Sequence, residues 1–168
     1  MKRENNSYRK LKDYMAGLVE QSTFLNDFVG YSQRELAGRD GSVDGLQSPY
    51  LALYGYELGL SGNEQNTMGV RKLNFAIMFN NVDPQDYESG YNTVDLAESL
   101  CLKVLARIRL DSSDPGHFLY NSFLKESIVI RPVELSMNSC GAEVYLELKN
   151  PQPLLVDAAD WNDIDTVC

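Results

Sequence analysis

The sequence predicts a single α+β domain, in which two main helices pack on an antiparallel or mixed β-sheet of about four strands with a long hairpin loop. Two stretches have apolar residues at every third or fourth position, which indicates amphipathic helices. Two further pairs of stretches alternate apolar and polar residues between turn-forming segments, which indicates β-hairpins. With 168 residues, 43% of them hydrophobic, the chain is long enough for one domain whose helices cover one face of the sheet.

The first helix is expected between Tyr8 and Val29. Ser22 could cap a second helical piece and so break this stretch. Residues 30–48 contain four glycines and are expected to form a connection, with at most one helical turn around Gln33 to Leu36. The apolar stripe of the helix consists of Leu11, Tyr14, Met15, Leu18, Val19, Leu25, Phe28 and Val29.

The first hairpin is expected between residues 50 and 80. Alternation over Tyr50–Leu58 predicts a strand, and Leu73, Phe75, Ile77 and Phe79 predict its partner. The polar segment Ser61–Gly69 separates the two strands, so we expect a long loop there.

The second half of the chain predicts another helix and another hairpin. The helix is expected over Thr93–Arg109, because its apolar residues form one stripe. Strands are expected over Ile128–Met137 and Ala142–Leu148, joined by a turn at Asn138–Gly141. Pro132 indicates an edge strand or a bulge.

Residues 1–156 are therefore predicted to form the domain, and residues 157–168 an acidic C-terminal tail. Basic residues gather near the start of the chain, whereas Asp157, Asp160, Asp163 and Asp165 gather near its end. Both termini could simply be solvated. Alternatively, the basic arm of one copy could contact the acidic tail of the next.

Composition limits the possible functions. The net charge of −9 disfavours specific nucleic-acid binding, because an acidic chain repels phosphate. The polar start and the lack of a long apolar run predict neither a signal peptide nor a membrane-spanning helix. Three cysteines without metal-type spacing indicate a reducing compartment, with Cys101 as a small core residue.

Catalytic patterns are not found, so we expect no enzyme, no cofactor and no metal site. The single histidine, His117, follows a Pro-Gly turn and has no nucleophile motif near it. Asp83, Asp86 and Glu88 could attract a cation, but they lack the spacing of a calcium loop and are expected to be solvated turn residues.

The tyrosines indicate a possible protein interface. Tyr50, Tyr54 and Tyr56 are expected on one face of a strand, and tyrosine is common at interfaces because it combines apolar area with a hydroxyl. The alternative is that this face lies under a helix.

The order of elements resembles the tail-terminator and tail-completion proteins of tailed bacteriophages. The resemblance rests on topology and size, over Leu11–Val29, Ser48–Glu57, Lys72–Asn80, Thr93–Arg109 and Ile128–Lys149. It implies a structural virion protein at the head–tail connection, assembled in the bacterial host cytoplasm. It also implies a homo-oligomeric ring, hexameric or larger, which contacts neighbouring neck or tail proteins and surrounds a channel through which DNA passes without specific binding.

The residues that this resemblance and the tyrosine pattern place at a subunit interface are Asn63, Glu64, Gln65, Asn66, Thr67, Met68, Tyr50, Tyr54, Tyr56, Asp160 and Trp161. Two other classes remain open. One is a small α+β protein-binding module of a bacterial cytoplasm, and the other is an enzyme that uses carboxylates such as Asp83, Asp86 or Glu57 in a cleft.

Overall fold

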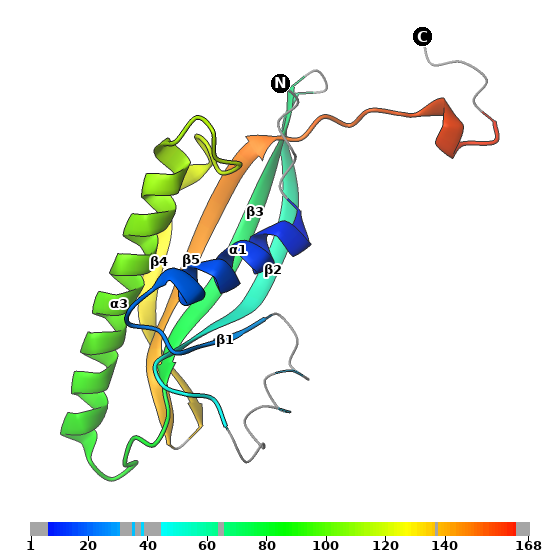
Figure 1. Cartoon of the computed structure of the whole chain (residues 1–168). Coiled ribbons are helices and arrows are strands. Elements are labelled where there is room, and N and C mark those ends of the chain that lie inside the picture. The colour runs from blue at the N-terminus through cyan, green and yellow to red at the C-terminus, as the bar shows by residue number, and fades with distance from the viewer. Residues whose placement is uncertain are drawn as a thin grey trace.

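The computed structural model describes residues 7–30, 35, 38, 45–63, 66–136 and 138–163, and it has the expected α+β class (Figure 1). The helical turn predicted around Gln33 to Leu36 lies outside the described residues, except for Glu35. The predicted interface residues Glu64 and Gln65 also lie outside them. The elements are α1 (Tyr8–Gln21), β1 (Asp27–Val29), β2 (Tyr50–Asn63), β3 (Asn66–Phe79), α3 (Tyr87–Ser113), β4 (Phe123–Ser136), β5 (Ser139–Pro151) and the short 3₁₀ helix η1 (Ala158–Asp160).

The sheet has five strands in the order β1-β2-β3-β5-β4, one more than expected. The additional strand is β1, which pairs in parallel with β2 in the register Asp27↔Tyr50, whereas the other neighbours are antiparallel. The prediction of helix for residues 22–29 is therefore wrong. Helix α1 ends at Gln21, where the Ser22 N–H bonds to the Val19 carbonyl at 3.1 Å. Local periodicity could not reveal β1, because its partner lies far along the chain.

The expected long loop in the first hairpin is also wrong. Strands β2 and β3 continue pairing as far as Asn63↔Asn66. Gly62 has a φ of 95°, a left-handed conformation that glycine tolerates, close to the turn. Strand β5 supports β3 as far as Met68↔Pro151, so exposed polar residues form regular strands here without an apolar face.

Both helices cover the same face of the sheet, as expected (Figure 1). Helix α3 begins at Tyr87, earlier than the predicted Thr93, because Asp86 caps it by accepting a hydrogen bond from the Ser89 N–H at 3.0 Å. Cys101 is fully buried, which confirms it as part of the core, and this burial raises the pKa of its thiol to about 12. The helices bury Leu11, Met15, Leu18, Val19, Ala97, Leu100, Cys101, Val104, Leu105 and Ile108 against the sheet.

The opposite face of the sheet carries a smaller apolar cluster and several charged pairs. A bulge between Leu53 and Gly55 shifts the alternation of β2. As a result, Tyr50 is buried in the smaller cluster, whereas Tyr56 packs against the helix-side core. Tyr54 lies on the same face of the sheet as Tyr50, and its hydroxyl donates a hydrogen bond to the Glu143 carboxylate. The prediction that the three tyrosines share one face is therefore wrong, because the bulge reverses the facing of Tyr56.

Within the described residues, none of the helices combines the length and the apolar character needed to cross a bilayer.

Candidate functional site

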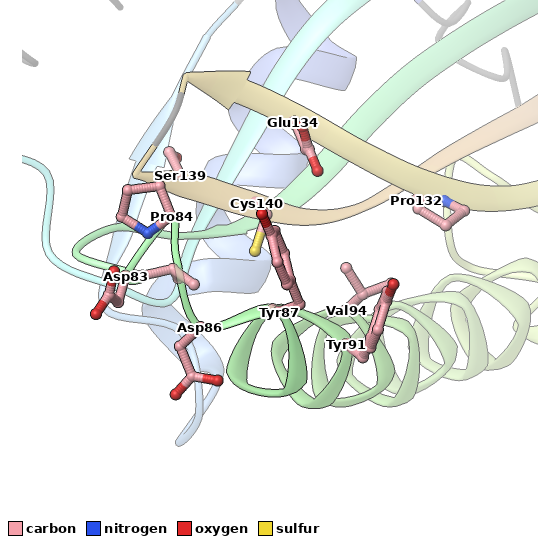
Figure 2. Close-up of a pocket in the computed structure, with 12 residues that line it drawn as sticks. Asp83, Pro84, Asp86, Tyr87, Tyr91, Val94, Pro132, Glu134, Ser139 and Cys140 are labelled. Carbon is pink, nitrogen blue, oxygen red and sulfur yellow. The ribbon is translucent and has the colours of Figure 1, made fainter.

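A groove lies between the first turns of α3 and the β4–β5 hairpin (Figure 2). Its volume is about 560 Å³, within the roughly 300–1,000 Å³ that is common for small-molecule sites. Its lining residues are Val82, Asp83, Pro84, Asp86, Tyr87, Gly90, Tyr91, Val94, Pro132, Glu134, Ser139 and Cys140.

One wall of the groove comes from the turn that joins β3 to α3. The Asp83 carboxylate accepts a hydrogen bond from the Gln85 N–H at 2.9 Å, and Asp86 caps the helix. Helix α3 consequently places Tyr87 and Tyr91 one turn apart on the same side. Figure 2 shows both rings standing up from the helix toward the strands, and the two side chains are 73% and 69% exposed.

The other wall comes from the two strands of the β4–β5 hairpin, close to the turn that joins them. Pro132 and Glu134 are contributed by β4, and Ser139 and Cys140 by β5. The Ser139 hydroxyl bonds to the Asn80 side-chain oxygen at 3.0 Å. This bond connects the hairpin to the end of β3 and so holds the two walls at a defined separation.

The groove combines aromatic rings with negative charge. In Figure 2 the carboxylates of Asp83 and Asp86 point away from the two tyrosines, whereas that of Glu134 extends from β4 on the side of Tyr87. Aromatic faces and a carboxylate both attract a positively charged group. The electrostatics of this groove therefore favour a cation over an anion.

Cys140 lines the groove, but its thiol is expected to have low reactivity. Burial, and then the negative charge of Glu134, raise the pKa of the Cys140 thiol. The thiol thus remains protonated at neutral pH, and a thiol is a poor nucleophile compared with a thiolate. Among the residues that the structure describes, no three or more His, Cys, Asp or Glu side chains are grouped so that they could hold a metal ion.

A second polar cluster lies between α1 and the end of α3, where the single histidine is found. The Tyr14 hydroxyl donates to Asp111 at 2.7 Å, and burial followed by this hydrogen bond raises the pKa of Tyr14. The His117 ring meets the Tyr14 ring edge-on at 5.5 Å between centroids and lies tilted against Phe118 at 4.7 Å, and its Nδ1 accepts from the Leu119 N–H at 3.2 Å. These contacts give His117 a structural role in the turn after α3.

The structure brings some of the predicted site residues together and separates others. Asp83 and Asp86 do line a groove, as the carboxylate alternative required, but Glu57 pairs with Lys72 at 3.1 Å on another part of the sheet. Sequence reasoning missed Tyr87 and Tyr91. The signal that could have found them is a pair of tyrosines four residues apart, directly after the helix-capping Asp86.

The predicted interface residues do not form one surface. Asn63, Thr67 and Met68 lie at the tip of the β2–β3 hairpin, whereas Asp160 and Trp161 lie on the exposed tail. A role for them in subunit contacts stays a prediction. The boundary expected at residue 156 also stays a prediction.

The fold and the groove together define an α+β domain with a cavity of small-molecule size. No family model matches the sequence. The chain is 25% identical over 159 residues to the D-alanine–D-alanine ligase of Buchnera aphidicola subsp. Schizaphis graminum, a similarity that covers 92% of this chain. The chain spans about half of the ligase, 51% of its length.

This similarity overturns the interpretation of the chain as a ring protein of the bacteriophage neck or tail. The similarity covers nearly the whole chain, and the similar protein is an enzyme and not a virion protein. The phage interpretation rested on the order of elements, and unrelated functions commonly share one arrangement of helices and strands.

Proposed function

We propose that the chain is a small-ligand-binding domain, related to one half of a D-alanine–D-alanine ligase, that takes a compact ligand with a positively charged amino group. The single observation that carries the proposal is the groove beside Tyr87 and Tyr91, whose size suits a small molecule and whose charge suits a cation. D-alanine, which the name of the ligase contains, belongs to this ligand class.

The expected contacts follow from the groove's residues. The amino group of the ligand lies against the faces of Tyr87 and Tyr91 and is balanced by the carboxylate of Glu134. Two cation–π contacts at exposed rings and one solvated ion pair contribute about 3 kcal/mol together. We therefore expect affinity no tighter than millimolar, since a millimolar Kd corresponds to about 4 kcal/mol.

The proposal covers binding and not ligation. The chain corresponds to 51% of the ligase, so any joining reaction would call on further elements.

The test is a titration followed by backbone amide NMR. D-alanine should produce saturable shifts at Tyr87, Tyr91 and Cys140, whereas N-acetyl-D-alanine, which lacks the positive charge, should not. Glu134→Gln should weaken binding up to about fivefold, the equivalent of about 1 kcal/mol. Glu126→Gln, an exposed carboxylate elsewhere on β4, serves as the matched control and should bind like the parent.

The proposal is wrong if D-alanine and small primary amines at high millimolar concentration leave the groove's resonances unmoved. It is also wrong if the acetylated ligand binds as well as the free amine, because charge would then not govern recognition.

A further inference from the structure

The C-terminal segment leaves the folded body as an extended arm. Up to residue 163, where the described part of the chain ends, its last backbone hydrogen bond to the sheet joins the Gln152 N–H to the Thr67 carbonyl at 2.9 Å. Beyond that point four large apolar side chains face solvent: Leu154, Leu155, Val156 and Trp161, which are 67%, 86%, 52% and 58% exposed. Three carboxylates, Asp157, Asp160 and Asp163, accompany them. Such a cluster of exposed apolar side chains indicates a surface that another polypeptide covers.

A cleft of complementary character lies between the C-terminal end of α1 and the middle of α3. Its volume is about 230 Å³, below the range of small-molecule sites and closer to the size of one large side chain. Lys103 Nζ lies 5.2 Å from the centre of the Phe24 ring. Arg107 Nε bonds to Asp111 at 2.9 Å. The lining residues are Leu18, Gln21, Ser22, Thr23, Phe24, Lys103, Val104 and Arg107, a set that includes two cations and no carboxylate.

Charge distinguishes this cleft from the groove beside Tyr87. The groove is lined by Asp83, Asp86 and Glu134, which repel an acidic segment. The cleft offers apolar walls and, since Arg107 is paired with Asp111, the positive charge of Lys103 at its rim, which complements an apolar segment that carries aspartates. The acidic tail therefore matches the cleft and not the groove.

We infer that the tail of one copy binds the α1–α3 cleft of a second copy, with the Trp161 ring in the cleft and the neighbouring aspartates beside Lys103. The one-turn helix η1, capped by the Asp157 side chain at the Ala159 N–H, presents Trp161 directly after Asp160. Figure 1 shows why the partner is a second copy: the tail leaves the end of β5 on the side of the body away from α3, where the cleft lies. This self-association is independent of ligand binding in the groove.

Sedimentation velocity over a range of protein concentrations tests the inference. The parent chain should associate as its concentration rises, and Trp161→Ser and Lys103→Glu should each raise the dissociation constant at least tenfold. The matched controls are Val129→Ser, an exposed apolar residue on β4, and Lys125→Glu, an exposed lysine on β4. Neither control should change the association.

A charge exchange identifies the contact itself. Asp160→Lys and Lys103→Glu should each associate poorly alone, but an equimolar mixture should recover association, because the exchanged charges face one another again. Failure of the mixture to recover would overturn the pairing of tail and cleft.

Trp161 is the only tryptophan, so its fluorescence reports where the tail lies. Emission should shift to the blue as association proceeds, since the indole leaves water. A parent chain that stays monomeric overturns the inference. If its emission is blue-shifted and responds to Lys103→Glu, the tail binds the cleft of its own chain. If its emission is that of an indole in water, the tail is unbound. Association that ignores Lys103→Glu overturns it as well.

Discussion

Gly141 lies where the backbone of β3 comes so close to β5 that a side chain would not fit. A Cβ at Gly141 would lie 1.9 Å from the Ile77 carbonyl oxygen and 3.1 Å from the Met78 Cα. Both neighbours are backbone atoms of a central strand, so they cannot rotate away as a side chain would. The turn expected over Asn138–Gly141 is wrong in its extent, because β5 already begins at Ser139. Gly141 lies inside this strand, where the close approach to β3 leaves no room for a side chain.

We expect Gly141→Ala to lower the free energy of unfolding by about 2–3 kcal/mol, because the added methyl group forces β3 and β5 apart. Urea denaturation followed by circular dichroism measures this. Gly59→Ala is the matched control: its nearest neighbour would be the Val70 carbonyl oxygen at 3.8 Å, an ordinary contact. The control should change stability by less than about 1 kcal/mol, and equal effects at both positions would contradict the steric explanation.

At the scale of elements, the junction between α3 and β4 depends on one buried hydroxyl. The Ser112 hydroxyl donates to the Leu119 carbonyl at 2.9 Å and accepts from the backbone N–H groups of Ser122 at 3.2 Å and Phe123 at 3.1 Å. Helix α3 thus ends in a fixed position relative to the first residue of β4. Backbone groups buried without partners are costly, so this hydroxyl adds to the turn bond from the Ser122 N–H to the Leu119 carbonyl at 2.8 Å.

Ser112→Ala should lower the free energy of unfolding by about 1–3 kcal/mol, since the Phe123 N–H loses the hydroxyl that it donates to. The Ser122 N–H and the Leu119 carbonyl keep their hydrogen bond to each other. The neighbouring Ser113 provides the control, because its hydroxyl is exposed and bonds only to the Arg109 carbonyl within the helix. Ser113→Ala should stay within about 0.5 kcal/mol of the parent. Thermal and chemical unfolding of the two variants side by side give the answer, and a Ser112→Ala protein as stable as the control would refute the assigned role.

At the scale of the whole molecule, the folded body ends before the chain does. Arg71 is buried at 2% exposure, and it donates to Asn150 at 2.7 Å and to Gln152 at 2.9 Å. These bonds hold the end of β5 against β3. The large apolar residues beyond them are each more than half exposed, so they contribute less to the fold and remain available for binding.

Two truncations should divide these roles. Ending the chain after Gln152 should leave the free energy of unfolding within about 0.5 kcal/mol of the parent, because residues 153–163, the described part of the removed segment, make no backbone hydrogen bond to the sheet. Ending it after Lys149 should cost at least about 2 kcal/mol, since the hydrogen bonds to the buried Arg71 guanidinium are lost. Similar unfolding midpoints for both truncations would contradict this division.

The local pattern of apolar and polar residues predicted most of the helices and strands. Two separate apolar stripes, one containing Leu11 and the other containing Ile108, predicted the two helices and the faces that they bury. This is possible because residues that recur with the 3.6-residue period of a helix lie on the side that packs against a core. Alternation identified the strands around Phe75 and Val144 for the same reason. Strand β1 and the bulge after Leu53 escaped, since a three-residue parallel strand and a shifted register depend on partners that no local window contains.

The sequence by itself determined the α+β class, the helix faces, the acidic charge and the exposed composition of the tail, because each is a property of neighbouring residues. Only the tertiary structure decided that Tyr87 and Tyr91 face Glu134 across a groove, that Tyr50 is buried, and that Lys103 and Phe24 border a cleft. Sites of this kind arise from residues on different elements. Their distances are set by packing between elements, and one-dimensional spacing carries no record of that packing.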